Sequence, residues 1–249
     1  MSSKDFVETY LCADGLPIGI SPLYQGDTDF GDEFINRDPR MRQTVYNSDR
    51  PYRIYDDGYV NYKPLPEFDF LFCPTSYYII KGYSPYERDR QEGQGVIDHF
   101  IYRYGLILVS YAEAKAELGE CDQDVLDKSI NLLRSRAGMP AMTETIGFAD
   151  PNWPNWEVPV SPLINEIRRE RRIECCTEAT RFDDLVRWKA GKLLENKKTY
   201  LGARDPGTSA YRVLYAGFER KWNDKLYLYP LPLQEITLNP DLDQNPGWK

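Results

Sequence analysis

The segment Ser161–Trp188 limits the possible folds of this chain more than any other segment. It contains no glycine, and its only proline, Pro162, suits the first position of a helix, where its missing N–H would have no partner. Ser161 is a typical N-cap residue. Five arginines and four glutamates lie between positions 166 and 181. Because buried charges need partners, we expect a helix in which guanidinium groups lie against carboxylates. We also expect this helix to break near residues 177–180.

Two roles are open to the glutamates of this helix. Glu166, Glu170, Glu174 and Glu178 are spaced by four residues and share one face. Two such carboxylates could serve as the acid and base of a glycoside hydrolase. The surrounding arginines favour ion pairs instead, which lower a carboxyl pKa, the wrong direction for a general acid. We therefore favour a structural role and retain hydrolysis as the weaker alternative.

Other catalytic and metal-binding motifs are missing from the sequence. His99 is the only histidine and has no nucleophile beside it, and neither a Gly-x-Ser-x-Gly motif nor a phosphate loop occurs. Five cysteines cannot all pair within one chain, and none form Cys-x-x-Cys. We interpret Cys175 and Cys176 as small buried residues. The prediction is a protein that is not an enzyme, with no catalytic residue, metal or cofactor.

Composition narrows the class of ligand. The net charge of −8 argues against nucleic acid or an anionic membrane surface as the main partner. Nineteen tyrosines are typical of a surface that binds sugar, peptide or protein, or of long loops packed by tyrosine. No apolar run of 18 residues occurs, and the N-terminus has no signal peptide, which taken literally predicts a cytoplasmic protein or a fragment.

The chain divides into three stretches, which we expect to form one mainly α domain with long irregular loops and a few short β-strands. Residues 1–98 are rich in turn signals, with short strands expected at 43–46, 53–55 and 76–81. Residues 99–140 predict a helical hairpin, and residues 141–249 contain loops, the charged helix and a proline-rich C-terminus.

The hairpin has clear helix signals. Apolar residues recur at helical spacing over 100–118, and a second helix should begin at Asp122 or Asp124 and stop at Gly138. The pair resembles one tetratricopeptide-type unit, which cannot bury its own faces alone. Beyond it, a strand is expected at Lys225–Tyr229, and prolines should make the terminal segment a strap packed along the charged helix.

Two motifs together resemble the C-terminal half of the SusD/RagB family. The first is in the charged helix and the second is at the C-terminus. They read Glu170-Arg171-Arg172-Ile173-Glu174, Glu178, Arg181-Phe182, Asp184-Leu185 and Arg187-Trp188, then Tyr229-Pro230-Leu231-Pro232, Glu235-Ile236, Asn239-Pro240, Leu242 and Gln244-Asn245-Pro246-Gly247-Trp248. The hairpin and Asn36-Arg37-Asp38-Pro39-Arg40 are similar to further family features. Ala179 departs from the pattern, because the family usually has glycine there.

The resemblance implies a non-catalytic nutrient-binding lipoprotein at the cell surface of the outer membrane. Its ligand would be a glycan or oligosaccharide, delivered to a TonB-dependent, SusC-like transporter. Family members are about twice as long, so this chain would correspond to their C-terminal half, without the signal and lipid anchor of the parent protein. The hairpin at 100–137 should then expose apolar surface or form an oligomer interface.

Candidate ligand-binding residues are aromatic side chains on loops, because aromatic rings cover the C–H faces of sugars and nearby polar groups bind hydroxyls. Two clusters fit, although either could instead be packing under loops. They are Trp153 and Trp156 with Asn152 and Asn155, and Tyr52, Tyr55, Tyr59 and Tyr62. Structural roles are predicted for Glu170, Arg172, Glu174, Arg181, Trp188 and Trp248. A peptide- or protein-binding tetratricopeptide-like module is the alternative function.

Overall fold

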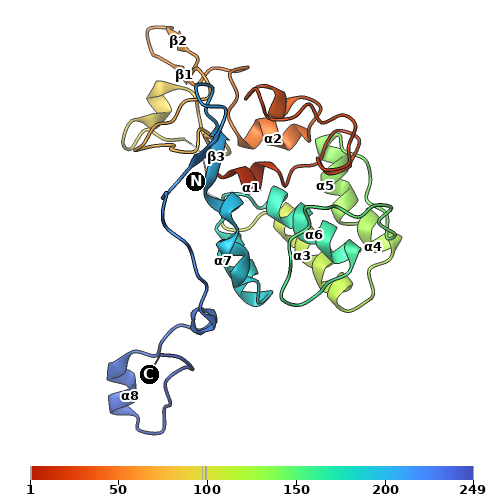
Figure 1. Cartoon of the computed structure of the whole chain (residues 1–249), viewed down its shortest axis with the longest axis vertical. Helices are drawn as coiled ribbons and strands as arrows, with labels where there is room; N and C mark the ends of the chain where they lie inside the picture. The colour runs from red at the N-terminus through yellow and green to blue at the C-terminus, as the bar shows by residue number, and fades with distance from the viewer. Residues whose placement is uncertain (1, 97, 99, 249) are drawn as a thin grey trace.

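The computed structural model describes residues 2–96, 98 and 100–248, so His99 lies outside the described residues. The chain is mostly helical with a few short strands, as predicted. Its helical body surrounds α6 (Pro162–Glu174), and the C-terminal segment extends away from that body (Figure 1). The other elements are α1 (Lys4–Val7), η1 (Asp32–Phe34), α2 (Pro39–Thr44), β1 (Arg53–Ile54), β2 (Val60–Asn61), η2 (Glu87–Arg90), α3 (Tyr104–Glu117), α4 (Gln123–Asp127), α5 (Ile130–Ala137), α7 (Thr180–Arg187), η3 (Gly191–Glu195), η4 (Lys197–Tyr200), β3 (Leu201–Arg204), β4 (Tyr211–Val213), η5 (Asp224–Tyr227) and α8 (Leu233–Leu238).

The charged segment forms two helices, as the sequence predicted. The Ser161 side chain accepts a hydrogen bond from the backbone N–H of Ile164, at 3.2 Å, and Pro162 occupies the first helical turn. Helix α6 ends at Glu174, and α7 begins at Thr180. Between them Ala179 has a φ of +61°, a left-handed conformation that glycine adopts more easily. The break explains why glycine would suit this position.

Helix α6 joins the two largest hydrophobic cores. Its Ile173 lies with Phe6, Tyr10 and Met41 in a core formed with the N-terminal segments. Its Ile167 lies in a second core, with the buried faces of α3, α4 and α5. Both isoleucines are almost fully buried. Because one short helix contributes to both cores, its position determines how the N-terminal segments sit on the helical hairpin.

The helical hairpin is present, but its first helix, α3, begins at Tyr104 rather than at Phe100, and its second helix is two helices, α4 and α5. Asp122 caps α4 by accepting a hydrogen bond from Val125 N, and Gly138 ends α5 with a φ of +73°. The division occurs at Ser129, whose hydroxyl donates to Val125 O at 2.5 Å. Such bonding to the preceding turn competes with the helix ladder, which the apolar periodicity did not reveal.

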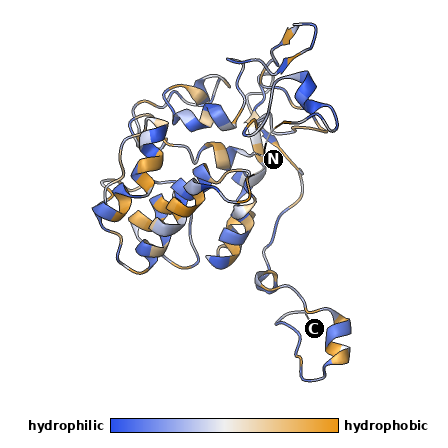
Figure 2. Cartoon of the chain, turned by 180° about the vertical axis from the view of Figure 1, so that it is seen from behind, coloured by the Kyte–Doolittle hydropathy of each residue, from blue (hydrophilic) through white to orange (hydrophobic). Residues whose placement is uncertain are grey.

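The outer face of α3 is apolar and exposed, as predicted for a single tetratricopeptide-type unit. Tyr104 is 70% exposed, Ile107 53% and Tyr111 42%. The inner face packs closely on α6. A Cβ added at Gly105 would lie only 2.8 Å from Glu174 Oε1, so the absence of a side chain there allows the two helices to approach. Figure 2 shows the hydrophobic residues of the body and of α8 from behind.

The strand predictions were only partly right. Arg53–Ile54 forms β1, which pairs with β2 in an antiparallel hairpin, with Arg53 opposite Asn61. The first two residues of 43–46 end α2, because Asp38 caps that helix and Pro39 begins it. Residues 76–81 contribute only an isolated bridge, Val45 to Ile79. Residues 225–229 form most of η5 rather than a strand, and β3 pairs with β4.

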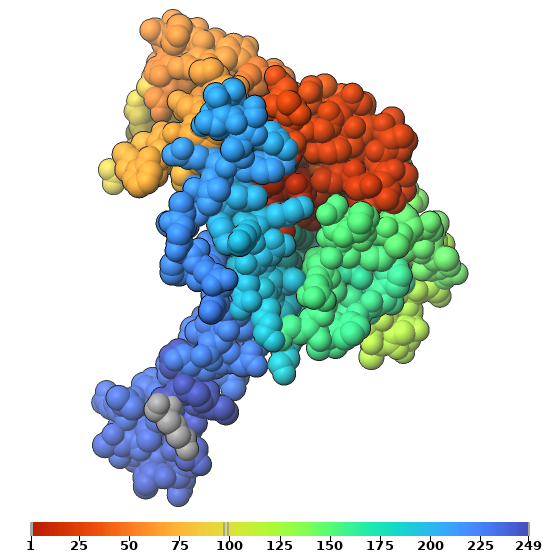
Figure 3. All heavy atoms as spheres, in the orientation of Figure 1, coloured from red at the N-terminus to blue at the C-terminus, as the bar shows by residue number. Residues whose placement is uncertain are grey.

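The prediction that the C-terminal segment packs along the charged helix was wrong. Helix α8 lies in a separate lobe away from α6 (Figures 1 and 3). The lobe satisfies its own polar groups: Trp248 Nε1 donates to Leu228 O at 2.9 Å, and Gln244 Nε2 donates to Leu231 O at 2.9 Å. Trp248 therefore closes this lobe on itself rather than fastening it to the body.

Candidate functional site

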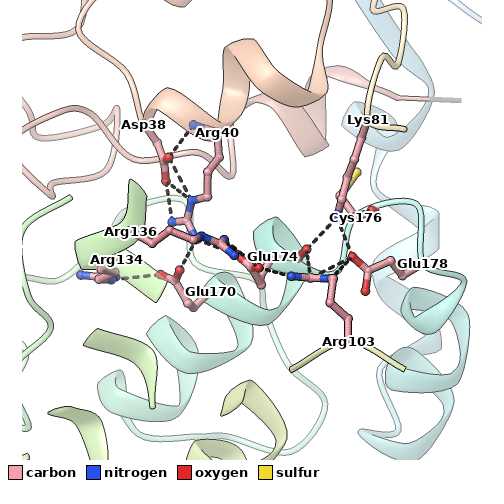
Figure 4. A network of polar contacts seen from close by, with 10 residues as sticks. All are labelled: Asp38, Arg40, Lys81, Arg103, Arg134, Arg136, Glu170, Glu174, Cys176 and Glu178. Atoms are coloured by element: carbon pink, nitrogen blue, oxygen red, sulfur yellow. Dashed lines mark hydrogen bonds and ion pairs between the residues drawn. The ribbon is translucent and has the colours of Figure 1, made fainter. Parts of the chain in front are cut away.

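A buried network of ion pairs runs along α6 (Figure 4). Glu170 accepts from Arg40 Nη1 at 2.5 Å and from Arg134 Nε at 2.9 Å. One turn later, Glu174 pairs with Arg40 at 3.2 Å, with Arg103 at 2.5 Å and with Arg136 at 2.8 Å. Both glutamates are at most 3% exposed. The network joins α2, α3 and α5 to α6. Paired charges were predicted, but these two glutamates pair with arginines from other segments rather than with the arginines of the charged helix.

The electrostatics of this network do not suit acid catalysis. Burial alone would raise the pKa of Glu170, but the charges of Arg40 and Arg134 outweigh burial and lower the pKa. For Glu174, burial is likewise outweighed by hydrogen bonds from Arg103 and Arg136, which lower the pKa to about 2. A general acid requires a raised pKa, so these carboxylates do not fit the glycosidase alternative.

The arginines of the charged segment differ in their partners. Arg172 pairs with Asp5 of α1, which joins the N-terminus to α6. Arg181 does not pair with Glu178, although a separation of three residues on a helix would allow it. Lys81 and Arg103 pair with that carboxylate instead. In the described part of the chain, Arg181 has no ion-pair partner and lies 5.8 Å from the Trp188 ring. Burial and the charge of Arg172 lower its pKa to about 9.

Replacing Arg181 by methionine is expected to raise the free energy of unfolding by about 1 kcal/mol, because an unpaired, partly desolvated charge opposes folding. Urea denaturation measures this. The matched control is Arg171→Met, which removes an ion pair with Asp184 at 2.8 Å and should lower stability. Equal destabilisation by both substitutions would mean that Arg181 also has a partner.

The tryptophan loop does not bring both rings to the surface. Trp156 is 9% exposed, packs edge-on against Trp188 at 5.6 Å between ring centroids, and donates to Asn165 Oδ1 at 2.5 Å. This burial gives Trp156 a packing role, but the residue also lines the large cavity of this region, so its ligand-binding role stays a prediction. Trp153 is half-buried, and its Nε1 donates to Glu166 Oε1 at 2.7 Å. Trp188 is buried, as predicted, with its Nε1 donating to Glu113 at 2.6 Å.

The loop borders a large cavity of about 1400 Å³. The start of the chain, the junction between α6 and α7, and the η3–η4 region complete its wall. Trp153 and Arg181 line it, with Asn152 and Asn155, whose side chains are exposed. The cavity is therefore polar and cationic in places. Trp153 and Trp156 are already hydrogen-bonded within the protein, whereas Phe182, which also lines the cavity, is 45% exposed.

The tyrosine cluster is divided between packing and exposure. Tyr52 packs against Tyr46 at 5.3 Å and stacks on Tyr83 at 5.6 Å, so it belongs to a small core. Tyr55 and Tyr59 lie 5.6 Å apart on the β1–β2 hairpin. Tyr59 is 63% exposed and Tyr62 is 53% exposed. The hairpin therefore presents two aromatic rings to solvent above a packed tyrosine base.

A second cavity, of about 480 Å³, lies beside this base, and sequence reasoning missed it. It is lined by Tyr52 and Phe72, with charged residues around them. Phe72 is 79% exposed on a turn in which Asp69 Oδ1 accepts from Leu71 N and Phe72 N. The available signal was an apolar run, Phe70-Leu71-Phe72, inside an irregular polar loop, where it has no helical or strand periodicity to explain it.

These features define a class of protein: a mainly helical scaffold, fastened by a buried ion-pair network, whose irregular loops carry exposed aromatic side chains. The chain belongs to the SusD family, whose family model matches residues 1–248. A search of curated proteins found no match.

Within the described residues, no group of acidic, histidine or cysteine side chains could hold a metal, and no helix is long and apolar enough to cross a membrane.

Solved structures are similar over nearly the whole chain. A SusD-like protein from Bacteroides fragilis NCTC 9343 is 25% identical to this chain, with a TM-score of 0.69. The alignment covers 99% of this chain and 46% of the B. fragilis chain. A SusD-like carbohydrate-binding protein from the same strain is 24% identical to this chain, with a TM-score of 0.65. This second alignment covers 97% of this chain and 48% of the other. The chain spans about half the length of these structures.

Proposed function

We propose that this chain is part of a non-catalytic protein that binds oligosaccharides through the exposed aromatic rings of the β1–β2 hairpin. The observation that carries the proposal is the exposure of Tyr59 and Tyr62 at a β-hairpin whose first strand, β1, contributes Arg53 to the wall of the smaller cavity. Flat rings flanked by polar groups suit the C–H faces and hydroxyls of sugars. A SusD-like relative described as carbohydrate-binding supports the same class of ligand.

Family membership supports a wider role for the parent protein. We propose that the parent protein acts at the cell surface of the outer membrane, held there by a lipid anchor, and passes the oligosaccharide to a TonB-dependent transporter. Acting as a receptor rather than a hydrolase agrees with the lowered pKa values of Glu170 and Glu174. The second candidate, a protein-interaction module, is favoured by the exposed apolar face of α3, including Tyr104 and Ile107.

Removing the two exposed tyrosines is expected to weaken oligosaccharide binding by about tenfold or more, the effect of losing a well-packed aromatic contact. The Tyr59→Ala/Tyr62→Ala variant is compared with wild type on a glycan panel, and the best ligand is titrated calorimetrically. Because both rings are exposed, the melting temperature should change little.

Two control variants make this test specific. Tyr229→Ala removes a ring that is 81% exposed but lies in the C-terminal lobe, and it should bind like wild type. Trp153→Ala tests the large cavity. Unchanged affinity in the double tyrosine variant, together with loss in Trp153→Ala, would move the site to the tryptophan loop. Binding to no glycan at all would contradict the proposed function.

A further inference from the structure

The smaller cavity carries more positive charge than its surroundings neutralise. Arg53, Lys63 and Arg90 line it, against one carboxylate, Asp69. Lys63 pairs with Glu67. Across residues 2–96, 98 and 100–248, neither arginine has a carboxylate within ion-pair distance, although the chain as a whole has a net charge of −8. Two arginine side chains without carboxylate partners at one cavity contrast with the net negative charge of the protein. They favour an anionic hydrogen-bond acceptor from outside the chain.

Arg53 is held at the cavity with a donor left over. It belongs to β1, opposite Asn61, and its guanidinium lies 5.4 Å from the Tyr55 ring centroid. Its Nε is buried and has no hydrogen-bond partner within the described residues. A buried N–H without an acceptor destabilises the protein until a partner is found. The other N–H groups of this guanidinium have no ion-pair partner in the described chain, so they are available at the cavity to an acceptor group from outside the chain.

Arg90 is fixed from behind by aromatic rings. Its Nη1 donates to the Tyr83 hydroxyl at 2.6 Å, and its guanidinium lies 5.0 Å from the Tyr83 ring. Tyr83 in turn stacks on Tyr52 and donates to Tyr52 O at 2.7 Å. The side chain of Arg90 is exposed, so its other N–H groups face solvent. Its guanidinium group is therefore held in place with N–H groups free to bind a carboxylate or sulfate.

The single carboxylate of the cavity does not neutralise these arginines. Asp69 Oδ1 accepts hydrogen bonds from the backbone N–H groups of Leu71 and Phe72, at 3.0 and 3.1 Å. Asp69 Oδ1 therefore stabilises the turn that places Phe72 at the cavity. An apolar ring and two unpaired guanidinium groups thus lie around one small space.

We propose that this cavity makes the protein selective for acidic oligosaccharides, with a carboxylate or sulfate group bound by Arg53 and Arg90 and a sugar face placed against Phe72. The inference rests on the proposed function and adds the chemical class of the ligand to it. Charge-assisted hydrogen bonds from arginine to these groups are stronger than bonds to hydroxyls, so they can discriminate acidic from neutral glycans. Binding should weaken as salt is raised, because the arginines are partly solvated.

The test uses matched probes on the full chain. An oligogalacturonate is compared with its methyl ester, which keeps the sugars and removes the charge, and a sulfated oligosaccharide is compared with its desulfated form. Wild type is expected to prefer the acidic member of at least one pair by about tenfold. That preference should disappear in Arg53→Gln/Arg90→Gln and persist in Arg88→Gln, whose side chain is 72% exposed and lies close to Asp89.

The outcomes separate this inference from the function on which it rests. Equal affinity for charged and uncharged members, with no effect of the double arginine substitution and with binding still lost in Tyr59→Ala/Tyr62→Ala, would overturn the acidic selectivity and leave oligosaccharide binding intact. Failure of every probe to bind would overturn both. Equal loss of charged and uncharged ligands in the arginine variant would assign the arginines to general sugar binding and overturn the selectivity.

Discussion

Replacing Glu170 by alanine is expected to lower the free energy of unfolding by about 3–5 kcal/mol. The carboxylate is 1% exposed and receives hydrogen bonds from Arg40 and Arg134, which are themselves buried. Removing it leaves their positive charge inside the protein with less compensation. This cost exceeds that of a surface ion pair, because water cannot take the place of the missing carboxylate.

Urea denaturation measures the effect, and Glu120→Ala provides the matched control. Glu120 pairs with Lys115 at 2.7 Å, but its side chain is 56% exposed, so its loss should cost less than about 1 kcal/mol. A Glu170→Ala protein as stable as the Glu120→Ala protein would mean that the network of α6 does not hold the fold together.

Acidification is expected to destabilise the protein between about pH 4.5 and pH 2. The pKa of Glu174 is lowered from 4.5 to about 2 in the folded state. A group whose pKa is depressed on folding stabilises the protein above its unfolded pKa, and this stabilisation is lost as pH falls toward the folded pKa. Each pKa unit corresponds to about 1.4 kcal/mol, so the loss from Glu174 amounts to roughly 3 kcal/mol.

The variant Glu174→Gln isolates this contribution, because Asp5 and Asp27 also have lowered pKa values and act in the same direction. Urea midpoints measured at several pH values from 6 to 2.5 should fall less steeply in the variant than in wild type. Identical slopes in both proteins, or stability that rises as pH falls, would contradict the assigned pairing with Arg103 and Arg136.

The parts of the fold that could be predicted from sequence have local causes. Ser161 and Pro162 specify the start of α6, and Gly138 specifies the end of α5, because capping depends on a few adjacent residues. The pairing of Glu170 and Glu174 with arginines was also predictable. Charges spaced by four residues share a helix face, and a helix that also contributes to the core cannot leave such charges unpaired.

Features that depend on distant residues were not predictable in the same way. The small cavity joins Tyr52, Phe72 and Arg90, which no periodic pattern relates. Glu178 pairs with Lys81 and Arg103 rather than with Arg181, although only Arg181 is at a helical spacing from it in the sequence. The C-terminal segment has the prolines of a strap, but Gln244 and Trp248 bond within its own lobe.

Burial also divided residues that look alike in the sequence. Trp153 and Trp156 share one short loop with two asparagines, yet only Trp156 lies against Trp188. Tyr52 and Tyr59 are seven positions apart on similar loops, but Tyr52 stacks within a core and Tyr59 faces solvent. Residue type indicates that a ring can bind a sugar, whereas tertiary packing decides whether its face is available.

We propose that the charged helix holds the fold together and that the loops bind the ligand. The most direct test is the affinity for one bound oligosaccharide, measured by calorimetry at neutral pH on folded Glu174→Gln and on Tyr59→Ala/Tyr62→Ala. We expect Glu174→Gln to melt at a lower temperature but to bind like wild type, and the tyrosine variant to melt like wild type but to lose binding. Lost affinity in folded Glu174→Gln, with full affinity in the tyrosine variant, would contradict this claim.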